Sequence, residues 1–218
     1  MHLTVDLKCR ILRDNIYGVD LDAQAVEVTQ LSLYLKMLEG EDRTTLQRQR
    51  ELFKDDIALL PPLQDNIRCG NSLIASDFSL VPEDLLRVNA FEWETGFRDI
   101  MRAGGFDAVI GNPPYIRIQG FPADQVGCFV RNYKAATGNY DIYVNFVERG
   151  IGLLGANGRS GMILPNKFLR TDYGVGLRTA PSERKALGRI VDFGFSQVFE
   201  ATTYNCLHCY PRQRCEAN

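Results

Sequence analysis

The sequence lacks any apolar run long enough to cross a membrane. Hydrophobic types make up 45% of its 218 residues, but charged residues interrupt every stretch before roughly 18 apolar positions accumulate. The first ten residues carry too many charges for the apolar core of a signal peptide. These absences argue against membrane-spanning and secreted classes and predict a cytoplasmic protein that makes no membrane contact.

A charge excess of one sign is also lacking. The chain has 25 Lys and Arg against 27 Asp and Glu, a formal net charge of -2. A stand-alone DNA-binding protein is usually strongly basic, so any nucleic-acid contact must come from a local patch or from a segment outside this chain.

The cysteines form no disulfide framework. Three are scattered along the chain, at Cys9, Cys69 and Cys128, and the other three crowd into the tail "CLHCYPRQRC". The tail also holds His208, but its spacing fits none of the common zinc patterns, so we predict no metal site.

Strand-like and helix-like segments alternate throughout. We expect strands at 15–20, 66–69, 108–110, 160–169 and 188–199. Helices are expected after Asp22 as N-cap, in the charged segment 41–54, as two short pieces within 77–105, from Tyr140 to Leu154, and between the last two strands. The alternation predicts a single α/β domain over residues 1–218, with a mostly parallel sheet covered by helices.

Two helices have apolar faces at helical spacing. The helix after Asp22 is expected to place four apolar side chains on one face: Val28, Leu31, Leu35 and Leu38. The aromatic residues of the second helix, Tyr140, Tyr143 and Phe146, are predicted to pack in the core rather than to stack on bases.

The stretch "FDAVIGNPPYIR" runs from an apolar strand into Asn112, two prolines and Tyr115. Pro113 biases Asn112 away from helical backbone, and each proline removes one N–H, so the segment is stiff and keeps free carbonyls. The Asn112 side-chain oxygen and the Pro113 carbonyl are acceptors that suit an exocyclic amine, and Tyr115 offers a flat face to its ring. Residues that follow a parallel strand face the crevice where ligands bind.

With its surroundings, this motif resembles that of a known family. The blocks "NIYGVDLDAQAVEVTQLSL", "IRCGNSL", "GGFDAVIGNPPYIR", "YDIYVNFVERGIGLL" and "GMILPNKFL" are similar, in this order, to the methylase part of restriction-modification enzymes typified by Eco57I. The resemblance implies a Rossmann-like methyltransferase fold that uses S-adenosylmethionine to methylate N6 of adenine in DNA.

The resemblance also implies site residues. Asn112, Pro113, Pro114 and Tyr115 match the catalytic motif. Asp20 matches the residue that binds the cofactor ribose, Leu21 is expected against the cofactor adenine, and Asn71 matches an Asp that contacts the adenine amine. The target adenine is expected to flip out of double-stranded DNA into the pocket.

Alternatives remain beside each assignment. Asp20 also suits a strand end, Asn71 a turn in "GNS", and Lys167 in "LPNKF" a solvated surface. Other enzymes with the same motif act on RNA adenine or on a protein glutamine amide, and a remnant without activity would serve only as a binding scaffold.

The resemblance is incomplete at both ends. Relatives open with a strand and a Gly-rich turn, whereas the first fourteen residues here contain no glycine and resemble the helix that follows such a turn. The polar tail after Tyr204 replaces an expected strand and target-recognition segment. We therefore expect a truncated catalytic domain lacking its first strand and Gly-rich turn, with any specificity domain or linked endonuclease outside this chain.

Overall fold

A computed structural model describes residues 3–40, 62–169, 189–193 and 205–211. The chain divides into two compact units, Met1–Ser72 with Val81–Ala90, and Leu73–Leu80 with Phe91–Asn218. The charged segment 41–54 and the helix predicted between the last two strands lie outside the described residues.

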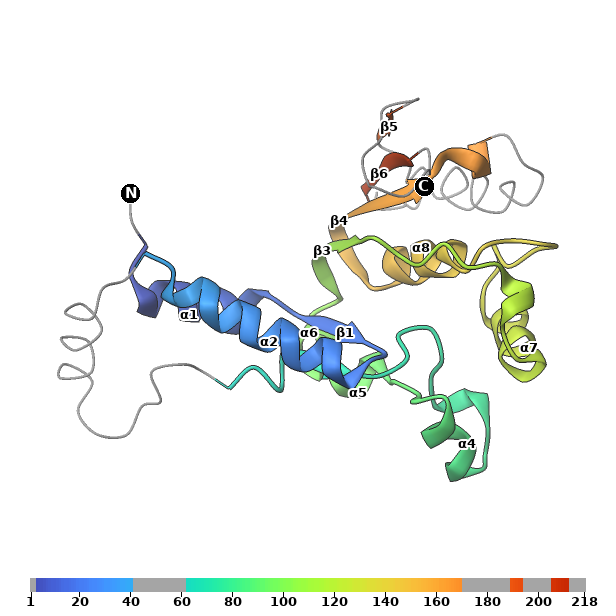
Figure 1. The fold of residues 1–218 in the computed structure, drawn as a ribbon, viewed down its shortest axis with the longest axis horizontal. Helices are drawn as coiled ribbons and strands as arrows, with labels where there is room; N and C mark the ends of the chain where they lie inside the picture. Colours follow the sequence, from blue (N-terminus) through green and yellow to red (C-terminus); the bar gives the residue numbers. More distant parts are fainter. Residues whose placement is uncertain (1–2, 41–61, 170–188, 194–204, 212–218) are drawn as a thin grey trace, which may run out of the picture. The chain divides into compact units, whose positions relative to one another are not determined.

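The described part of the first unit contains three helices and two short parallel strands. Its elements are α1 (Val5–Asn15), β1 (Gly18–Asp20), α2 (Ala23–Leu38), β2 (Ile67–Cys69) and α4 (Pro82–Arg87). Helices α1 and α2 lie side by side (Figure 1). The predicted cap is confirmed, because the Asp22 carboxylate accepts from the N–H of Gln24 at 2.9 Å.

The register of β1 and β2 places two strand ends together. Gly18 lies opposite Ile67 and Asp20 opposite Cys69, and the N–H of Gly70 donates to the Asp20 carbonyl at 2.8 Å. Two of the predicted strands thus form a parallel pair, but the first begins at Gly18 and not at residue 15, because Asn15 is the last residue of α1. Their carboxyl ends point the same way, which is the arrangement in which loops after the strands can share a ligand.

The apolar face predicted for α2 is wrong. Val28, Leu31 and Leu35 are 57–61% exposed among the described residues, whereas Val26 and Met37 are buried. The stripe from Val28 to Leu38 therefore does not form the face that packs in this unit.

The reason lies in two polar side chains on the packed face of α2. The amide of Gln30 donates to the Ile67 carbonyl at 3.1 Å, and the hydroxyl of Tyr34 accepts from the N–H of Leu63 at 3.2 Å. Such side chains pack through their carbon atoms and form hydrogen bonds through their polar ends. They are therefore not counted in a search for apolar residues at helical spacing.

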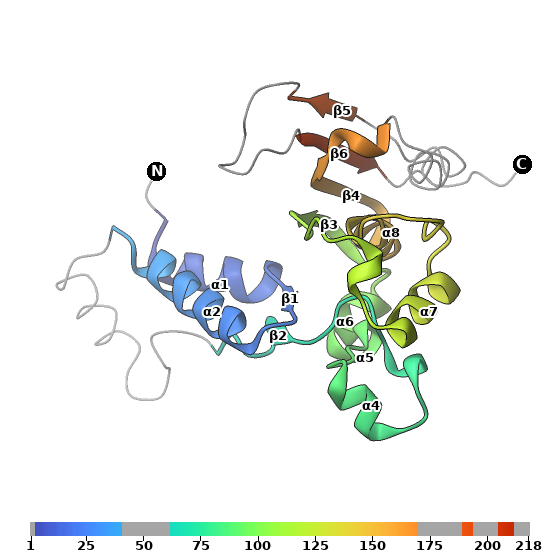
Figure 2. The same ribbon diagram turned by 45° about the vertical axis from the view of Figure 1, so that its right-hand side comes forward.

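The second unit contains a four-stranded sheet in the order β3-β4-β6-β5, which Figure 2 shows. The strands are β3 (Phe106–Gly111), β4 (Leu154–Pro165), β5 (Arg189–Asp192) and β6 (Asn205–Pro211). Strand β4 runs parallel to β3 and antiparallel to β6, and β6 also runs antiparallel to β5. The predicted α/β fold is confirmed, and β1–β2 and β3–β4 pair in parallel as expected. The antiparallel strand β6 was not predicted from the tail sequence.

The described part of the second unit also contains several short helices. They are η1 (Ser76–Phe78), α5 (Trp93–Gly96), α6 (Arg98–Arg102), η2 (Ile118–Gly120), α7 (Ala123–Asn132), α8 (Tyr143–Gly152) and η3 (Asn166–Leu169). The two helices predicted within 77–105 are too few, because α4, α5, α6 and part of η1 lie there. The predicted strand 160–169 is wrong at its end, where η3 replaces it, and β4 begins earlier than expected.

Helix α8 packs closely on the sheet, as its apolar spacing predicts. Tyr140 and Tyr143 are buried, which confirms their assignment to the core. Gly150 permits the approach, because a Cβ there would lie 2.7 Å from the Cε of Met162 in β4. Ile110 belongs to the apolar strand predicted at 108–110, but its side chain is 87% exposed among the described residues.

An aromatic cluster fills the space beneath β3. Phe91, Trp93, Phe97 and Phe106 lie with ring centroids 5.3–6.0 Å apart. Edge-on contacts dominate, with interplanar angles of 84° for Phe91–Trp93 and 89° for Trp93–Phe106. The insertion before β3 therefore supplies part of the core that supports this strand.

Candidate functional site

The motif Asn112 to Tyr115 directly follows β3, at its carboxyl end. Asn112 and Pro114 are exposed, Pro113 is buried and Tyr115 is half-buried. Since Pro113 and Pro114 have no N–H to donate, the chain leaves the sheet without needing a backbone acceptor there. The buried Pro113 anchors the segment while its neighbours face outward.

Tyr115 is held at both ends of its side chain. Its hydroxyl lies 2.9 Å from Oδ1 of Asn112 and 3.3 Å from the carbonyl oxygen of Ile163 in β4. Its ring meets the buried ring of Tyr143 edge to face, with centroids 6.2 Å apart at 84°. The hydroxyl therefore fixes which way the Asn112 amide points.

Backbone pairing fixes the chain immediately after the motif. The N–H of Ile142 donates to the Ile116 carbonyl at 2.8 Å, and that of Ile118 donates to the Tyr140 carbonyl at 3.0 Å. Arg117 and Asp141 form the antiparallel bridge between these contacts. The motif is thus tied to β3 on one side and to the start of α8 on the other.

Acceptors outnumber donors at this turn. No described residue donates to the Pro113 carbonyl, and Oδ1 of Asn112 accepts only from Tyr115 among the described residues. An amide oxygen has a second lone pair, so Asn112 can accept another hydrogen bond while Tyr115 stays in place. The turn can therefore receive a group that carries two N–H bonds.

The first unit holds the three residues predicted for the cofactor. Asp20 ends β1 and is exposed, and its Oδ1 accepts from the N–H of Asp22 at 2.8 Å. Its Oδ2 makes no hydrogen bond within the described part of the chain. One carboxylate oxygen is thus used to shape the turn, and the other can accept from a hydroxyl.

Leu21 and Asn71 follow the two parallel strands. Leu21 is 59% exposed although it is apolar, and Asn71 lies two residues beyond Cys69, the register partner of Asp20. The structure therefore brings Asp20, Leu21 and Asn71 to one end of the β1–β2 pair. The four motif residues belong to the other unit.

These residues fit the adenosine part of S-adenosylmethionine chemically. A carboxylate oxygen accepts from a ribose hydroxyl, an exposed leucine offers apolar contact to a purine, and an amide oxygen accepts from its amine. A purine ring bound at this end of the strands would cover the exposed side chain of Leu21.

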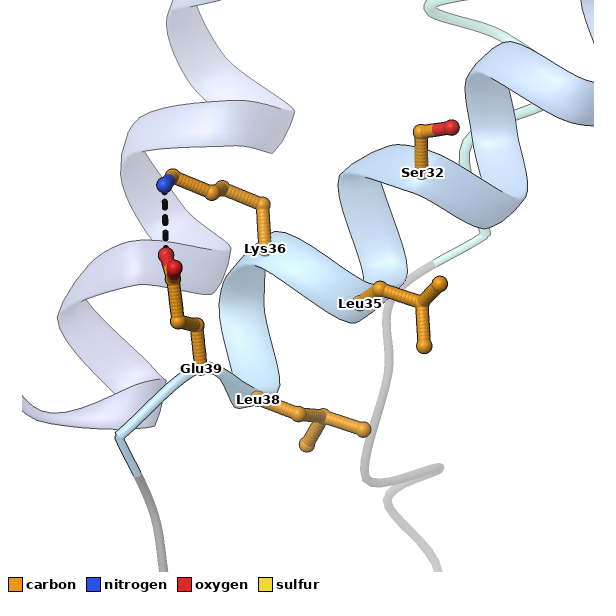
Figure 3. Close-up of a pocket in the computed structure, with 5 residues that line it drawn as sticks. All are labelled: Ser32, Leu35, Lys36, Leu38 and Glu39. Atoms are coloured by element: carbon orange, nitrogen blue, oxygen red, sulfur yellow. Dashed lines mark ion pairs between the residues drawn. The ribbon is translucent and has the colours of Figure 1, made fainter.

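A separate hollow lies at the end of α2 (Figure 3). It is lined by Ser32, Leu35, Lys36, Leu38 and Glu39, and contains none of the predicted site residues. Lys36 and Glu39 form an ion pair there. We assign this hollow no part in the site.

Two other features of the described residues concern metals and membranes. Across residues 3–40, 62–169 and the two short strands after them, no group of three or more metal-ligating side chains comes together. The cysteine side chains of the tail lie outside the described residues. No helix in the described ranges has the length and apolarity that a membrane span requires.

Sequence reasoning missed two residues next to the site. Tyr143 was assigned to the core alone, yet it also supports the Tyr115 ring. Asn89 was not singled out, although its carbonyl accepts from the N–H of Asn71 at 2.6 Å. Asparagine often adopts left-handed backbone just after the end of a helix, and this preference could have singled out Asn89 from the sequence.

Comparison with known proteins agrees with these features. The sequence matches the family described as "Eco57I restriction-modification methylase" over residues 14–199. RM.Eco57I of Escherichia coli, a type II restriction enzyme and methyltransferase, is 37% identical over 209 residues, which are 94% of this chain and 19% of that protein. The adenine-specific methyltransferase PglX of Streptomyces coelicolor is 24% identical over 79% of this chain and 15% of that protein.

A solved structure shares the fold. The type IIL restriction-modification enzyme MmeI, in complex with DNA, aligns with a TM-score of 0.58 at 14% identity, over 99% of this chain and 26% of that one. The chain thus spans about a fifth of RM.Eco57I, and the match covers most of its own length. The chain belongs to the Eco57I restriction-modification methylase family and has the α/β methyltransferase fold that its sequence predicts.

Proposed function

We propose that this chain carries the catalytic domain of an S-adenosylmethionine-dependent methyltransferase that modifies N6 of adenine in DNA. The observation that carries the proposal is the turn after β3, where the Asn112 oxygen and the Pro113 carbonyl can both accept hydrogen bonds beside the Tyr115 ring. An exocyclic amine on a planar ring is the group that such a turn suits.

The relatives favour adenine in DNA over other amines as the methyl acceptor. RM.Eco57I is named as a restriction enzyme and methyltransferase, PglX as adenine-specific, and MmeI was solved in complex with DNA. N6 of a paired adenine is engaged within the duplex, so the base flips out before it reaches the turn.

The reaction is a direct displacement. S-adenosylmethionine supplies a methyl group on a positively charged sulfur. When bound, the cofactor would give up this methyl group to the lone pair of N6: the sulfur–carbon bond would break with its electrons staying on sulfur, and N6 would lose one proton to water. No covalent bond to the protein is needed.

The chain's own groups would act on the amine. Oδ1 of Asn112 and the carbonyl of Pro113 accept its two N–H bonds, which turns the nitrogen lone pair out of the ring plane. The same acceptors stabilise the positive charge that develops on nitrogen in the transition state. Tyr115 lies against the ring, and Pro114 keeps the turn rigid.

Asp20, Leu21 and Asn71 would hold the cofactor. Asp20 accepts from the ribose hydroxyls, Leu21 contacts the purine and Asn71 accepts from its amine. We further propose that both compact units belong to one catalytic domain, acting in the cytoplasm within a restriction-modification system. A linked endonuclease and a specificity domain would lie outside this chain.

Substrate class is tested by offering three methyl acceptors to the purified chain. With radiolabelled S-adenosylmethionine, the proposal predicts label in mixed-sequence duplex DNA, recovered as N6-methyladenine, and none in RNA or in protein glutamine. Label in RNA or protein alone would assign the motif to the alternative substrates.

Cofactor binding separates an enzyme from a remnant. Isothermal titration calorimetry with S-adenosylmethionine is expected to show binding that Asp20→Ala abolishes. If the wild-type chain binds nothing at millimolar ligand and labels no acceptor, it is an inactive scaffold and the proposed function is wrong.

A further inference from the structure

Asn89 adopts an unusual backbone conformation just after α4. Its φ is 50°, and it is the single non-glycine residue with positive φ in the described part of the chain. Its N–H donates to the Leu86 carbonyl at 3.1 Å, and the N–H of Ala90 donates to the Leu85 carbonyl at 2.9 Å. These two bonds form the Schellman motif that ends a helix with a left-handed residue.

The carbonyl of Asn89 holds the chain after β2. It accepts from the N–H of Asn71 at 2.6 Å, and Asn71 forms a parallel bridge with Ala90. The preceding N–H, that of Gly70, donates to Asp20 in β1. The turn that carries Asn71 is therefore held at two successive residues: Gly70 is bonded to β1, and Asn71 is bonded to Asn89.

The side chain of Asn89 reaches the chain after β1. Its Nδ2 lies 3.2 Å from Sγ of Cys69 and 3.5 Å from the carbonyl oxygen of Leu21. The Cys69 thiol lies 3.6 Å from that same carbonyl. One half-buried asparagine thus contacts the turns of both strands that carry predicted cofactor residues.

We propose that Asn89 is a positioning residue for the adenosine end of the cofactor. It sets Leu21 through its side chain and Asn71 through its carbonyl, and so fixes the spacing between the two residues that contact the purine. This role rests on the proposed function, because it requires S-adenosylmethionine to bind at Asp20, Leu21 and Asn71. Asn89 does not itself touch the ligand.

A purely structural role as helix cap is the competing explanation. The two roles are separable because glycine is the residue that most readily adopts left-handed backbone. Asn89→Gly keeps the helix end and the carbonyl that accepts from Asn71, and it removes only the side-chain contacts to Leu21 and Cys69. If Asn89 acts only as a helix cap, this variant should bind the cofactor as well as wild type does.

The experiment compares wild type, Asn89→Gly, Asn89→Asp and Asp20→Ala. Calorimetry measures the dissociation constant for S-adenosylmethionine, and thermal unfolding measures stability. We expect Asn89→Gly to unfold at or above the wild-type temperature and to bind about five- to tenfold more weakly, as for one lost hydrogen bond. Asn89→Asp should bind more weakly still, because it places a carboxylate oxygen against the Leu21 carbonyl.

The outcomes separate this role from the proposed function. If wild type binds, Asp20→Ala does not, and Asn89→Gly binds like wild type, the cofactor site stands and the role of Asn89 is wrong. If wild type binds nothing, the cofactor assignment is wrong and the role falls with it.

A second measurement needs no ligand. Amide hydrogen exchange in the free chain should be faster in Asn89→Gly than in wild type at Asp22 to Gln24, beside Leu21, while the Asn71 amide stays protected by the retained carbonyl. Unchanged exchange beside Leu21 would contradict the proposed contact.

Discussion

The hydroxyl of Tyr115 donates a 2.9 Å hydrogen bond to Oδ1 of Asn112, three residues before it. The bond orients the amide oxygen that we assign to the amine of the target base. It also gives Tyr115 two separable roles, since the hydroxyl positions Asn112 and the ring can contact the base.

Replacing Tyr115 in two steps tests these roles. Tyr115→Phe keeps the ring and frees the Asn112 amide, so we expect the turnover rate to fall about tenfold, as for one lost hydrogen bond of about 1.4 kcal/mol, with the KM for DNA unchanged. Tyr115→Ala should also raise KM, because the ring contact is lost. Steady-state kinetics on duplex DNA measure both values. Equal effects of the two variants would argue against a separate role for the ring, and a wild-type rate for Tyr115→Phe would argue against a role for the hydroxyl.

Asn66 is predicted to stabilise the first unit. Its buried Nδ2 donates to the carbonyls of Arg13 at 2.8 Å and Ile16 at 2.9 Å, at the end of α1. Asn66→Ala removes both bonds and leaves the Arg13 carbonyl with only the longer bond from the Tyr17 hydroxyl, at 3.4 Å. We expect it to lower the free energy of unfolding by about 1–3 kcal/mol. Urea denaturation measures the change.

Asn15→Ala is the matched control for Asn66. Asn15 donates its amide to the Ile11 carbonyl at 3.1 Å, but it is exposed, so water replaces the lost bond. We expect this variant to unfold within about 0.5 kcal/mol of wild type. An equal loss of unfolding free energy in both variants would contradict the inference that burial makes the Asn66 hydrogen bonds more important than the exposed one of Asn15.

Gly104 and Gly105 form a natural pair for testing the approach to β3. Both have positive φ, 107° and 114°, but a Cβ at Gly104 meets nothing within 4 Å, whereas one at Gly105 lies 2.5 Å from the Leu153 carbonyl oxygen. Gly104→Ala carries only backbone strain of about 1–2 kcal/mol. Gly105→Ala adds a clash with backbone atoms and should cost at least about 2 kcal/mol more. Thermal or urea unfolding gives both values, and similar losses would contradict the close approach.

The raised pKa of Tyr133 predicts that the stability of the fold depends on pH. Burial raises the pKa of its hydroxyl from 10.0 to about 12, an effect that the nearby Arg149 guanidinium partly offsets. The unfolded chain loses this proton at lower pH than the folded chain. The contribution to stability is therefore complete below pH 10 and is lost as the pH rises toward 12, by about 3 kcal/mol for two pKa units.

The variant Tyr133→Phe isolates this contribution. It cannot ionise, so the stability advantage of wild type over this variant should fall to zero as the pH rises above 10 and then change sign. At neutral pH it should cost about 1 kcal/mol, since the hydroxyl donates to the Leu73 carbonyl at 2.7 Å. A difference that does not change with pH would contradict the raised pKa.

Local sequence rules predict much of this fold and part of the site. The cap at Asp22, the parallel strands and the turn after β3 follow from residue types and spacing along the chain, and the structure places each near its predicted position. The packed face of α2 was missed because Gln30 and Tyr34 carry polar atoms that only the folded chain satisfies. Burial of such side chains depends on partners far away in sequence.

Contacts between distant segments account for the remaining differences. The bond from Asn71 to Asn89 joins residues separated by α4, and strand β6 is defined by its pairing with β4 and β5. No periodicity within a short window predicts either contact. The helical assignment of the first residues, by contrast, follows from the order of elements in the family, and the structure places α1 there with Thr4 as its N-cap.

The central claim is that the Asn112 oxygen acts on the N6 amine of adenine in DNA. The most direct measurement is the single-turnover rate of N6-methyladenine formation on duplex DNA, quantified by mass spectrometry, for wild type, Asn112→Ala and the exposed control Gln119→Ala. The account predicts a loss of at least about a hundredfold for Asn112→Ala, as for a transition-state acceptor, and a wild-type rate for Gln119→Ala. Equal N6-methyladenine formation by Asn112→Ala and wild type would contradict it.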